Sequence, residues 1–327
     1  MGTISIERER ALRQRVARSV KIKAEKLSST FETSASRLFV GTKLYLEGVH
    51  FDLNYTTGHE LGRRLITIGA NAMACAGLRP EKVCVVLGMR QETHEMFLTE
   101  FFGGVHKTAK KQEINLSGAD LTVSPTAMAV NLVFSGKLLR TSLRARVRPG
   151  DVLAVSGPLG TSAAGLECLK KLGRENLQNW ESLVRAHLVP PAQAVVVEKL
   201  LKLGGVRDAV LLNEGFAMDL NLAADKWGVG AMVTQSSIPV AEAIHWAGRS
   251  LNVDPQRWVL YGGEDQQLLL ALDPNRAGSI LENFRLKVVG EVVAKKKGVK
   301  LQNGKGDWQP FLPRAWNDLV RRSAPLI

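Results

Sequence analysis

The stretch VLAVSGPLGTSAAGLECLKKLG, residues 152–173, decides the fold class of the second half of the chain. Its first four residues are apolar and predict a buried strand. The glycines and Pro158 that follow predict a turn, and the remainder predicts a helix. Glycines between a strand and a helix let backbone N–H groups converge on an anion at the start of the helix. The stretch therefore predicts an α/β unit whose turn either contacts a phosphate or is a plain tight turn.

The segments that follow alternate between helix and strand in the same way. Helical spacing of apolar residues predicts helices at 192–203, 216–227 and 239–250. Short apolar runs predict strands at 208–213, 229–235, 257–261, 266–272, 287–293 and 298–302. Because a Pro149-Gly150 turn precedes the whole series, we expect a C-terminal α/β domain over residues 149–327.

The preceding segments predict a second arrangement over residues 31–148. Strands are expected at 37–46, 83–89, 112–123 and 127–136, and helices at 59–77 and 93–105, the second ending near Gly103 and Gly104. The order β-α-β-α-β-β is the ferredoxin-like alternation with slight variation. Residues 1–30 have only a thin apolar stripe and are expected to form a basic helix or arm. Both halves mix helices and strands, so the predicted fold class is α/β or α+β.

Composition indicates a soluble globular protein. The chain has 327 residues, of which 45% are hydrophobic and 23% are charged. No run approaches the ~18 apolar residues of a membrane span, and Met1–Arg15 lacks the apolar core of a secretory signal. The cysteines Cys75, Cys84 and Cys168 have no metal-ligand spacing. We expect a cytoplasmic protein without a membrane partner.

The charge balance is unusual, with 44 Lys and Arg against 31 Asp and Glu, a net charge of +13. Much of the excess lies in the first 26 residues and in a lysine cluster at 295–300. An anionic partner, such as nucleotide phosphates or nucleic acid, is one interpretation. A solvated helix face and a lysine-rich turn are the interpretation we favour, because no aromatic residues interleave with these charges as a base-stacking surface needs.

Three further segments carry residues suited to chemistry. LEGVHFDL (46–53) is the end of a strand that turns into a loop, and LLNEGFAMDL (211–220) has Glu214 and Asp219 around the start of a helix. YGGEDQQLLLAL (261–272) has an acidic pair after two glycines. Glu264 and Asp265 could hold a cation or a substrate amine, or they could satisfy local backbone donors.

These segments, in this order along the chain, resemble the thiamine-monophosphate kinase family, within the superfamily of aminoimidazole ribonucleotide synthetase. The resemblance runs from about Leu38 to Trp316 and includes GVGA (228–231) and VVGEVV (288–293). It implies a ferredoxin-like N-terminal half that forms a β-barrel shared in a homodimer, beside a C-terminal α/β half. It also implies ATP- and Mg²⁺-dependent phosphoryl transfer to thiamine monophosphate, which gives thiamine diphosphate.

The resemblance also assigns roles to individual residues. Glu214 and Asp120 would be catalytic and hold the metal. The nucleotide and its phosphates would contact Lys43, Gly118, Asp120 and Thr122. The substrate would contact His50, Phe51, Glu264, Asp265 and Trp316. His50 and Phe51 have an alternative interpretation as a capped strand end and a core phenylalanine.

Several of the family's aspartate motifs are changed in this chain. KLSST (26–30) offers no carboxylate where the family has GDDAA, Lys43 replaces the aspartate of TTD, and Ala72 replaces that of NLSD. Glu214 stands in the SDG motif, and Gln193 replaces a family arginine. Mg²⁺ prefers carboxylate oxygens, so we expect its site to be weakened or absent.

Three hypotheses follow. The chain is a working kinase with fewer metal ligands, a degenerate paralogue that acts as a small-molecule binding or regulatory protein and keeps the fold and the dimer, or a nucleic-acid-binding protein. We weigh the third lowest.

Overall fold

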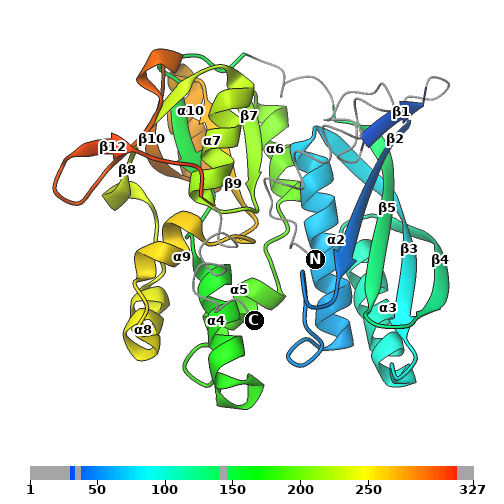
Figure 1. The fold of residues 1–327 in the computed structure, drawn as a ribbon. Helices are drawn as coiled ribbons and strands as arrows, with labels where there is room; N and C mark the ends of the chain where they lie inside the picture. The colour runs from blue at the N-terminus through cyan, green and yellow to red at the C-terminus, as the bar shows by residue number, and fades with distance from the viewer. Residues whose placement is uncertain (1–29, 34–37, 140–145, 315–327) are drawn as a thin grey trace, which may run out of the picture.

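The computed structural model describes residues 30–33, 38–139 and 146–314, and it contains two β-sheets with helices packed on them (Figure 1). We call residues 38–138 the N-terminal half and residues 146–314 the C-terminal half. The expected basic segment at 1–30 lies, apart from Thr30, outside the described residues. In the part of the chain that is described, no helix is both long and apolar enough to cross a membrane.

The N-terminal half has the predicted element order. It contains β2 (Leu38–Leu46), α2 (Gly58–Cys75), β3 (Leu78–Arg90), α3 (Glu95–Lys111), β4 (Asn115–Ser124) and β5 (Ala129–Leu138). With β1 (Thr30–Thr33) they form a sheet in the order β1-β2-β5-β3-β4, in which β3 and β4 are parallel and the other pairs are antiparallel. The sheet is open, so the described residues of one chain form no closed barrel.

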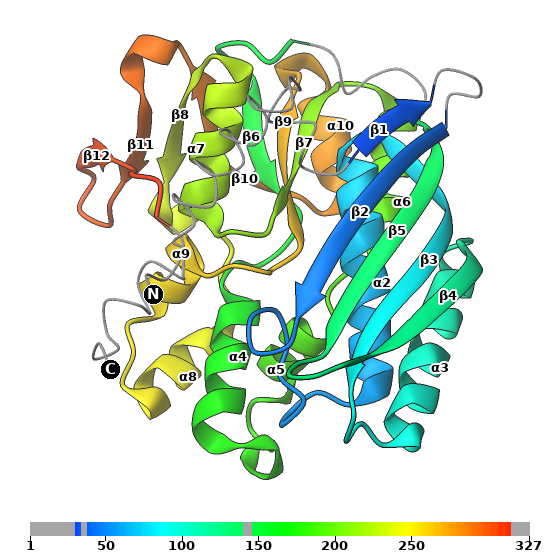
Figure 2. The ribbon, with the colours of Figure 1, turned by 45° about the vertical axis from the view of Figure 1, so that its right-hand side comes forward.

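Helices α2 and α3 cover one face of this sheet, as Figure 2 shows. A capping box between Thr57 and Glu60 starts α2. The prediction that the second helix ends near Gly103 and Gly104 is wrong, because α3 continues to Lys111. A Cβ on Gly104 would collide with the backbone of His59 on α2. This glycine therefore permits close helix packing rather than ending the helix.

The C-terminal half is built on a seven-stranded sheet in the order β12-β11-β8-β10-β6-β9-β7. Its strands are β6 (Val152–Val155), β7 (Val206–Leu212), β8 (Gly230–Thr234), β9 (Gln267–Leu272), β10 (Lys287–Val293), β11 (Val299–Gln302) and β12 (Trp308–Pro310). Its helices are α4 (Thr161–Leu172), α5 (Glu181–Leu188), α6 (Ala194–Leu203), α7 (Phe216–Trp227), α8 (Glu242–Leu251), α9 (Pro255–Tyr261) and α10 (Pro274–Phe284). Apolar residues are buried on both faces of the sheet.

One predicted strand of this half is wrong. Residues 257–261 belong to α9, which begins after Asp254, whose side chain accepts a hydrogen bond from the backbone N–H of Gln256. Pro255 at the first helical position fits this start because its ring fixes a helical φ. Trp258 is fully buried, so the apolar run reflects packing on the core rather than an extended backbone.

Asn71, on α2, links the N-terminal half to the C-terminal half through hydrogen bonds. Its Oδ1 accepts hydrogen bonds from the backbone N–H groups of Gln193 (2.7 Å) and Ala194 (3.2 Å). Its Nδ2 donates to Pro191 O at 2.9 Å and to Gln266 Oε1 at 3.3 Å. The side chain is fully buried, and its bonds to Gln193 N and Gln266 Oε1 are buried, so at least these two partners would lack water if the amide were removed.

Replacement of Asn71 by alanine should therefore destabilise the protein by about 2–4 kcal/mol, since several buried polar groups lose their partner. Urea unfolding followed by circular dichroism measures the change. Asn283→Ala, on the exposed side of α10, is the matched control and should have little effect. Equal stability of the two variants would show that the Asn71 contacts do not hold the halves together.

Candidate functional site

The predicted motifs meet where the two halves touch, around a buried ion pair between Arg64 of α2 and Glu264. Arg64 Nη2 lies 2.8 Å from Glu264 Oε2, and Arg64 Nη1 donates to His50 O at 3.2 Å. The Arg64 side chain is 1% exposed and that of Glu264 is 30% exposed. A buried guanidinium is strongly destabilising unless it is paired, so this contact fixes three segments together. We call the residues around this pair the boundary site.

The Glu264 loop has an unusual backbone. Glu264 and Gln266 have φ values of +66° and +53°, a left-handed conformation that most side chains avoid. Backbone hydrogen bonds from Glu264 N to Asn213 O (2.8 Å) and from Gln266 N to Leu212 O (3.0 Å) hold the loop against the end of β7. The loop is therefore set by tertiary contacts, which is common where a fold positions functional side chains.

His50 caps the loop after β2. Its Nδ1 accepts a hydrogen bond from the backbone N–H of Leu46 at 3.0 Å, so the proton of the neutral ring is on Nε2. Burial lowers the pKa of His50. Phe51 is 3% exposed and packs in the core of the N-terminal half. A substrate contact by either residue stays a prediction, and the contacts present are those of a capped strand end with a core phenylalanine.

Asp265 occupies the anion position at the start of α4. Its carboxylate accepts hydrogen bonds from the N–H groups of Gly160 (2.6 Å) and Ser162 (3.0 Å) and from Thr161 Oγ1 (3.2 Å). The glycine turn thus gathers N–H groups as predicted, but the chain supplies the anion itself. Burial raises the pKa of Asp265 to about 6.

Ser162 and His187 lie together without forming a nucleophilic triad. Ser162 Oγ is 3.1 Å from His187 Nδ1, and Glu264 Oε2 is 3.8 Å from the same nitrogen. A triad needs the acid on the other ring nitrogen. Burial lowers the pKa of His187 well below its ordinary value, and both residues are almost completely buried. The pair is therefore a neutral packing contact.

Glu214 and Asp219 stand at the start of α7. Asp219 Oδ2 accepts from the backbone N–H groups of Asn213 (2.7 Å), Glu214 (2.9 Å) and Gly215 (3.2 Å). Burial raises the pKa of Asp219 to about 7. Glu214 Oε1 accepts from Asn213 Nδ2 at 3.0 Å.

The other predicted residues lie on the N-terminal sheet or outside the described residues. Lys43 is exposed on β2, and by strand alternation it points to the same side as buried Tyr45. Asp120 is exposed on β4, paired with Val86 of β3, and Gly118 and Thr122 share its face. Trp316 is beyond the described residues.

One chain does not bring Asp120 to the boundary site. In the sheet order, β4 is the edge strand and lies three strand spacings from β2, roughly 14 Å. Figures 1 and 2 both show β4 on the side away from the C-terminal half. A metal shared by Asp120 and Glu214 therefore remains a prediction that requires a second copy of the chain.

The family resemblance implies Mg²⁺, which prefers carboxylate oxygens in an octahedral arrangement. Asp219 and Asp265 each accept three hydrogen bonds from the protein, and Glu264 is paired with the buried guanidinium. Among the residues that the structure describes, no three His, Cys, Asp or Glu side chains are grouped to hold a metal ion. The donors present in one described chain do not fit a magnesium site.

Sequence reasoning missed three residues near the boundary site, Tyr45, Arg64 and His187. The buried atoms Tyr45 Oη, Arg64 Nε and His187 Nε2 have no hydrogen-bond partner among the residues that the structure describes. Burial raises the pKa of Tyr45, with smaller effects from the charges of Arg64 and Glu264. Such atoms require water or a ligand. For Arg64, the sequence did contain a signal, because this arginine stands within the otherwise apolar face of a predicted helix.

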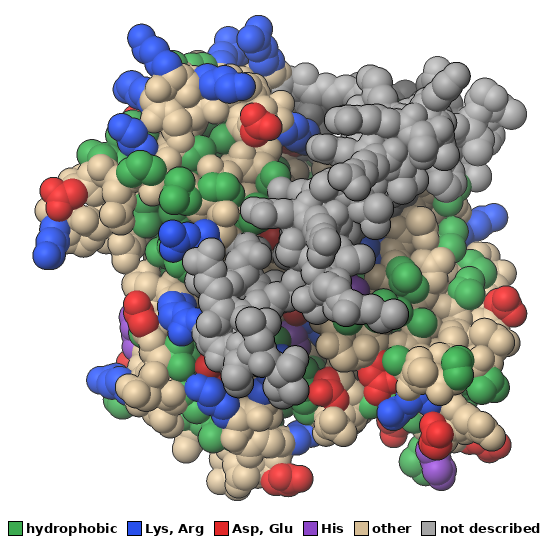
Figure 3. Space-filling view, viewed as in Figure 1, with side chains coloured by type: hydrophobic (Ala, Val, Ile, Leu, Met, Phe, Trp, Pro, Cys, Tyr) green, Lys and Arg blue, Asp and Glu red, His purple; other side chains and the backbone are tan. Residues whose placement is uncertain are grey.

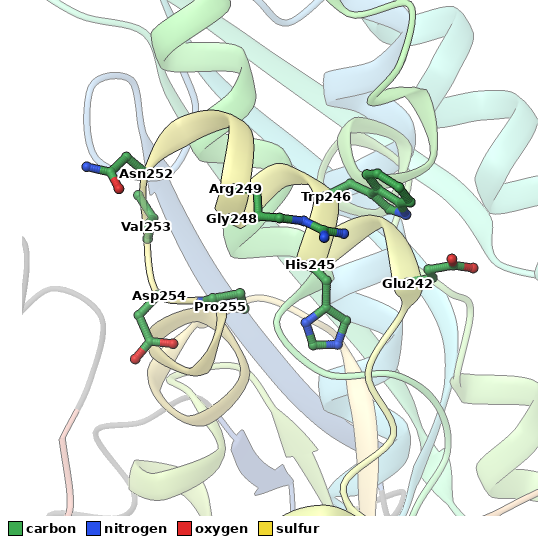
Figure 4. A pocket seen from close by; sticks show the side chains of 9 residues that line it. All are labelled: Glu242, His245, Trp246, Gly248, Arg249, Asn252, Val253, Asp254 and Pro255. Atoms are coloured by element: carbon green, nitrogen blue, oxygen red, sulfur yellow. The ribbon is translucent and has the colours of Figure 1, made fainter.

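A hollow of about 770 Å³ lies elsewhere, on helices α8 and α9 (Figure 4). Arg249 stacks over the Trp246 ring with its Cζ 4.4 Å from the centroid, and Glu242, His245 and Asp254 also line the hollow. None of the predicted site residues lines it. Because Arg249 already stacks on one face of the indole and the lining charges are mixed, we assign this hollow no function.

The family model of AIR synthase related protein, N-terminal domain, matches residues 29–138. A thiamine-monophosphate kinase of Corynebacterium glutamicum is 31% identical over 72% of this chain and 71% of its own. That of Aquifex aeolicus is 25% identical over 80% of this chain and 84% of its own.

Solved structures share the fold. AaThiL complexed with AMPPCP and TMP superposes with a TM-score of 0.82 at 23% identity, over 97% of this chain and 99% of that chain. The hydrogenase maturation protein HypE in complex with ATP gives 0.67 at 20% identity, over 85% of both chains. At these identities the likeness shows the fold alone.

The raised pKa of Asp219 predicts a pH-dependent stability. Between its ordinary value of 3.8 and about 7 the folded protein keeps a proton that the unfolded chain has lost. The free energy of unfolding should therefore fall as the pH rises through this window, by an amount on the order of 2–4 kcal/mol. Asp219→Asn cannot titrate and should lack this component.

Urea unfolding of both proteins from pH 4 to pH 8 measures the difference. Asp225→Asn, at an 85% exposed side chain on the same helix, is the control and should follow the wild type. If the free energy of unfolding changes with pH in the same way for the wild type and Asp219→Asn, the pH dependence does not come from Asp219.

Proposed function

The chain belongs to the thiamine-monophosphate kinase family, and from this premise we propose that it binds thiamine monophosphate, or a similar phosphate ester, at the boundary site. A structure with the same fold was solved with AMPPCP and TMP, which supports both a nucleotide and a small phosphate ester as ligands. Within the described part of the chain, the buried atoms Tyr45 Oη and His187 Nε2 have no hydrogen-bond partner, which supports a polar ligand or its water at this place.

The residues present suggest how such a ligand is held. Lys43 supplies a positive charge on the exposed part of β2, and it is one of the charges that lower the pKa of His50. A neutral His50 can donate its Nε2 hydrogen to a phosphate oxygen, because its Nδ1 is already an acceptor. Lys43 attracts the phosphate as a point charge, but it cannot bridge phosphate oxygens as a metal does.

We infer that magnesium-supported phosphoryl transfer is lost in this member of the family. One observation carries this inference: Asp219, Glu264 and Asp265 are each bonded to donors of the protein itself. Phosphoryl transfer depends on positioning and on neutralising charge on the phosphates, which the metal provides when bound. The protein then acts as a small-molecule binding or regulatory protein.

A working kinase is the second candidate, and the position of Asp120 favours it. This carboxylate is exposed on the uncovered face of the N-terminal sheet, where a second copy could place it beside the partner's boundary site. Glu214 retains a carboxylate at the start of α7. The reaction would then be ATP-dependent formation of thiamine diphosphate.

The same sheet face supports a homodimer. No described element covers it, and it presents a row of Leu44, Asn131, Val86 and Asp120 across four strands. Leu44 is 52% exposed and Val86 is 37% exposed. Two such faces packed together would bury this apolar surface, and exposed patches of this kind commonly mark an interface.

The first experiment compares binding with catalysis. We expect calorimetry to show binding of thiamine monophosphate without added magnesium, weakened about tenfold by Lys43→Ala through loss of a charge-assisted contact. Lys305→Ala, a lysine of the β11–β12 turn, is the control and should bind normally. We expect no thiamine diphosphate above background with ATP and magnesium, with the Corynebacterium relative as positive control.

Thiamine diphosphate production that disappears in Asp120→Asn or Glu214→Gln would overturn the loss of transfer and establish the working kinase. If neither binding nor turnover is observed, thiamine monophosphate is not a ligand of this protein.

If this sheet face forms the homodimer interface, a charge introduced into it should weaken the association of the two chains. Val86→Glu would place a carboxylate in the centre of the apolar face and should convert a dimer to a monomer in light scattering coupled to size exclusion. Leu222→Glu, at an exposed position on α7, is the matched control and should remain dimeric. A wild-type monomer at all concentrations tested would exclude this interface.

A further inference from the structure

A second hollow, of about 690 Å³, lies at the opposite end of the C-terminal sheet from the boundary site. The boundary site follows the C-terminal ends of β6 and β7, whereas this hollow lies beside the first residues of β7 and the last of β10. These strands are four to seven residues long, so the two sites are separated by roughly 13–23 Å. We call it the basic pocket. Its lining consists of Arg146–Pro149, Arg207, Trp227–Val229, Ala294 and Lys295.

The pocket is strongly positive. Arg146 and Arg148 are exposed, and neither has an ion pair with another described residue. Lys295 is 69% exposed and only 3.9 Å from the exposed Asp225, a contact that contributes little. Space-filling colours show Lys and Arg gathered over the end of this half that carries α10 (Figure 3). The pocket therefore offers three cationic groups to a ligand.

Arg207 differs from these three, because acidic residues already neutralise it. Its Nη2 lies 2.7 Å from Asp273 Oδ2 and its Nε lies 3.4 Å from the buried Asp151 Oδ1. This arginine forms the floor of the pocket and supports its shape. The positive charge available to a ligand therefore comes from Arg146, Arg148 and Lys295.

An aromatic surface stands beside these charges. The indole of Trp227 is half-buried, and its Nε1 donates to Asp208 Oδ2 at 2.7 Å, which fixes the ring. Lys226 Nζ contacts the same carboxylate at 2.9 Å. The lysine cluster at 295–300 lacked an aromatic neighbour in the sequence, but the fold places Trp227 in the same pocket as Lys295.

We propose that the basic pocket binds a nucleoside phosphate, with the base against Trp227 and the phosphates between Arg146, Arg148 and Lys295. Arginines recognise phosphate oxygens through paired hydrogen bonds, and a fixed indole stacks on any base. The hollow has the size of ordinary small-molecule pockets, about 300–1,000 Å³. Because three cations and a single indole surround one hollow, a free nucleotide fits it better than an extended nucleic acid strand, which needs a row of stacking rings. This site is separate from the proposed function and does not depend on it.

Photolabelling locates the ligand directly. The full-length protein is irradiated with 8-azidoadenosine diphosphate in EDTA, and the labelled peptides are identified by mass spectrometry. We expect label in the peptides that contain residues 146–149 or 227–229, with protection by unlabelled ADP. Label confined to peptides of the boundary site would overturn the proposal, and this result is independent of whether the kinase reaction occurs.

Two pairs of variants test the chemistry. Arg146→Gln/Arg148→Gln should weaken ADP binding about tenfold or more, through loss of charge-assisted hydrogen bonds. Arg185→Gln/Arg249→Gln, at exposed positions on α5 and α8 that do not line this pocket, changes the net charge equally and should bind like the wild type. Equal affinity of the two double variants would reject the site.

Trp227→Phe and Trp227→Leu both lose the bond to Asp208, but only the first keeps an aromatic face. ADP should bind the phenylalanine variant about five- to tenfold more tightly, through retained stacking. If both variants bind equally, or inorganic pyrophosphate binds the wild type as tightly as ADP, no base is recognised and the proposal fails. Tighter binding of a single-stranded RNA oligomer than of ADP would replace the nucleotide with a nucleic acid.

Discussion

A guanidinium that has been removed from water must be paired, and the pairing of Arg64 with Glu264 organises the boundary between the two halves. The arginine lies on the first helix of the N-terminal half, and its partner lies two hundred residues later in a loop of the C-terminal half. Glu264 has a left-handed backbone, and its N–H donates to Asn213 O at the end of β7. The next residue, Asp265, then reaches the start of α4, where its carboxylate accepts three hydrogen bonds.

This arrangement also sets the electrostatic character of the boundary site. Carboxylates that could bind a cation are instead bonded within the protein, and Lys43 adds a positive charge near His50. The anion position at the start of α4 is filled by Asp265 rather than left for a phosphate. The phosphate ester that we propose would therefore depend on Lys43 and His50 rather than on the start of α4.

Sequence periodicity gave the element order of the N-terminal half and most elements of the C-terminal half, because alternation and helical spacing follow from which face is buried. It failed at α9, where a short apolar run is equally compatible with a buried helix and a strand, and Pro255 was the missed signal. It also misread Gly104, since a glycine at a helix crossing and one at a helix end look the same in a sequence.

The sequence by itself determined the family and the order of the motifs, because these depend only on which residues follow one another. Only the tertiary structure decided which side chains meet. It joined Arg64 to Glu264, separated Asp120 from Glu214 by the width of a sheet, and brought Trp227 beside the arginines at 146 and 148. The physical reason is that these contacts link residues far apart in the chain, and their partners are chosen by packing and by the cost of burying an unpaired charge.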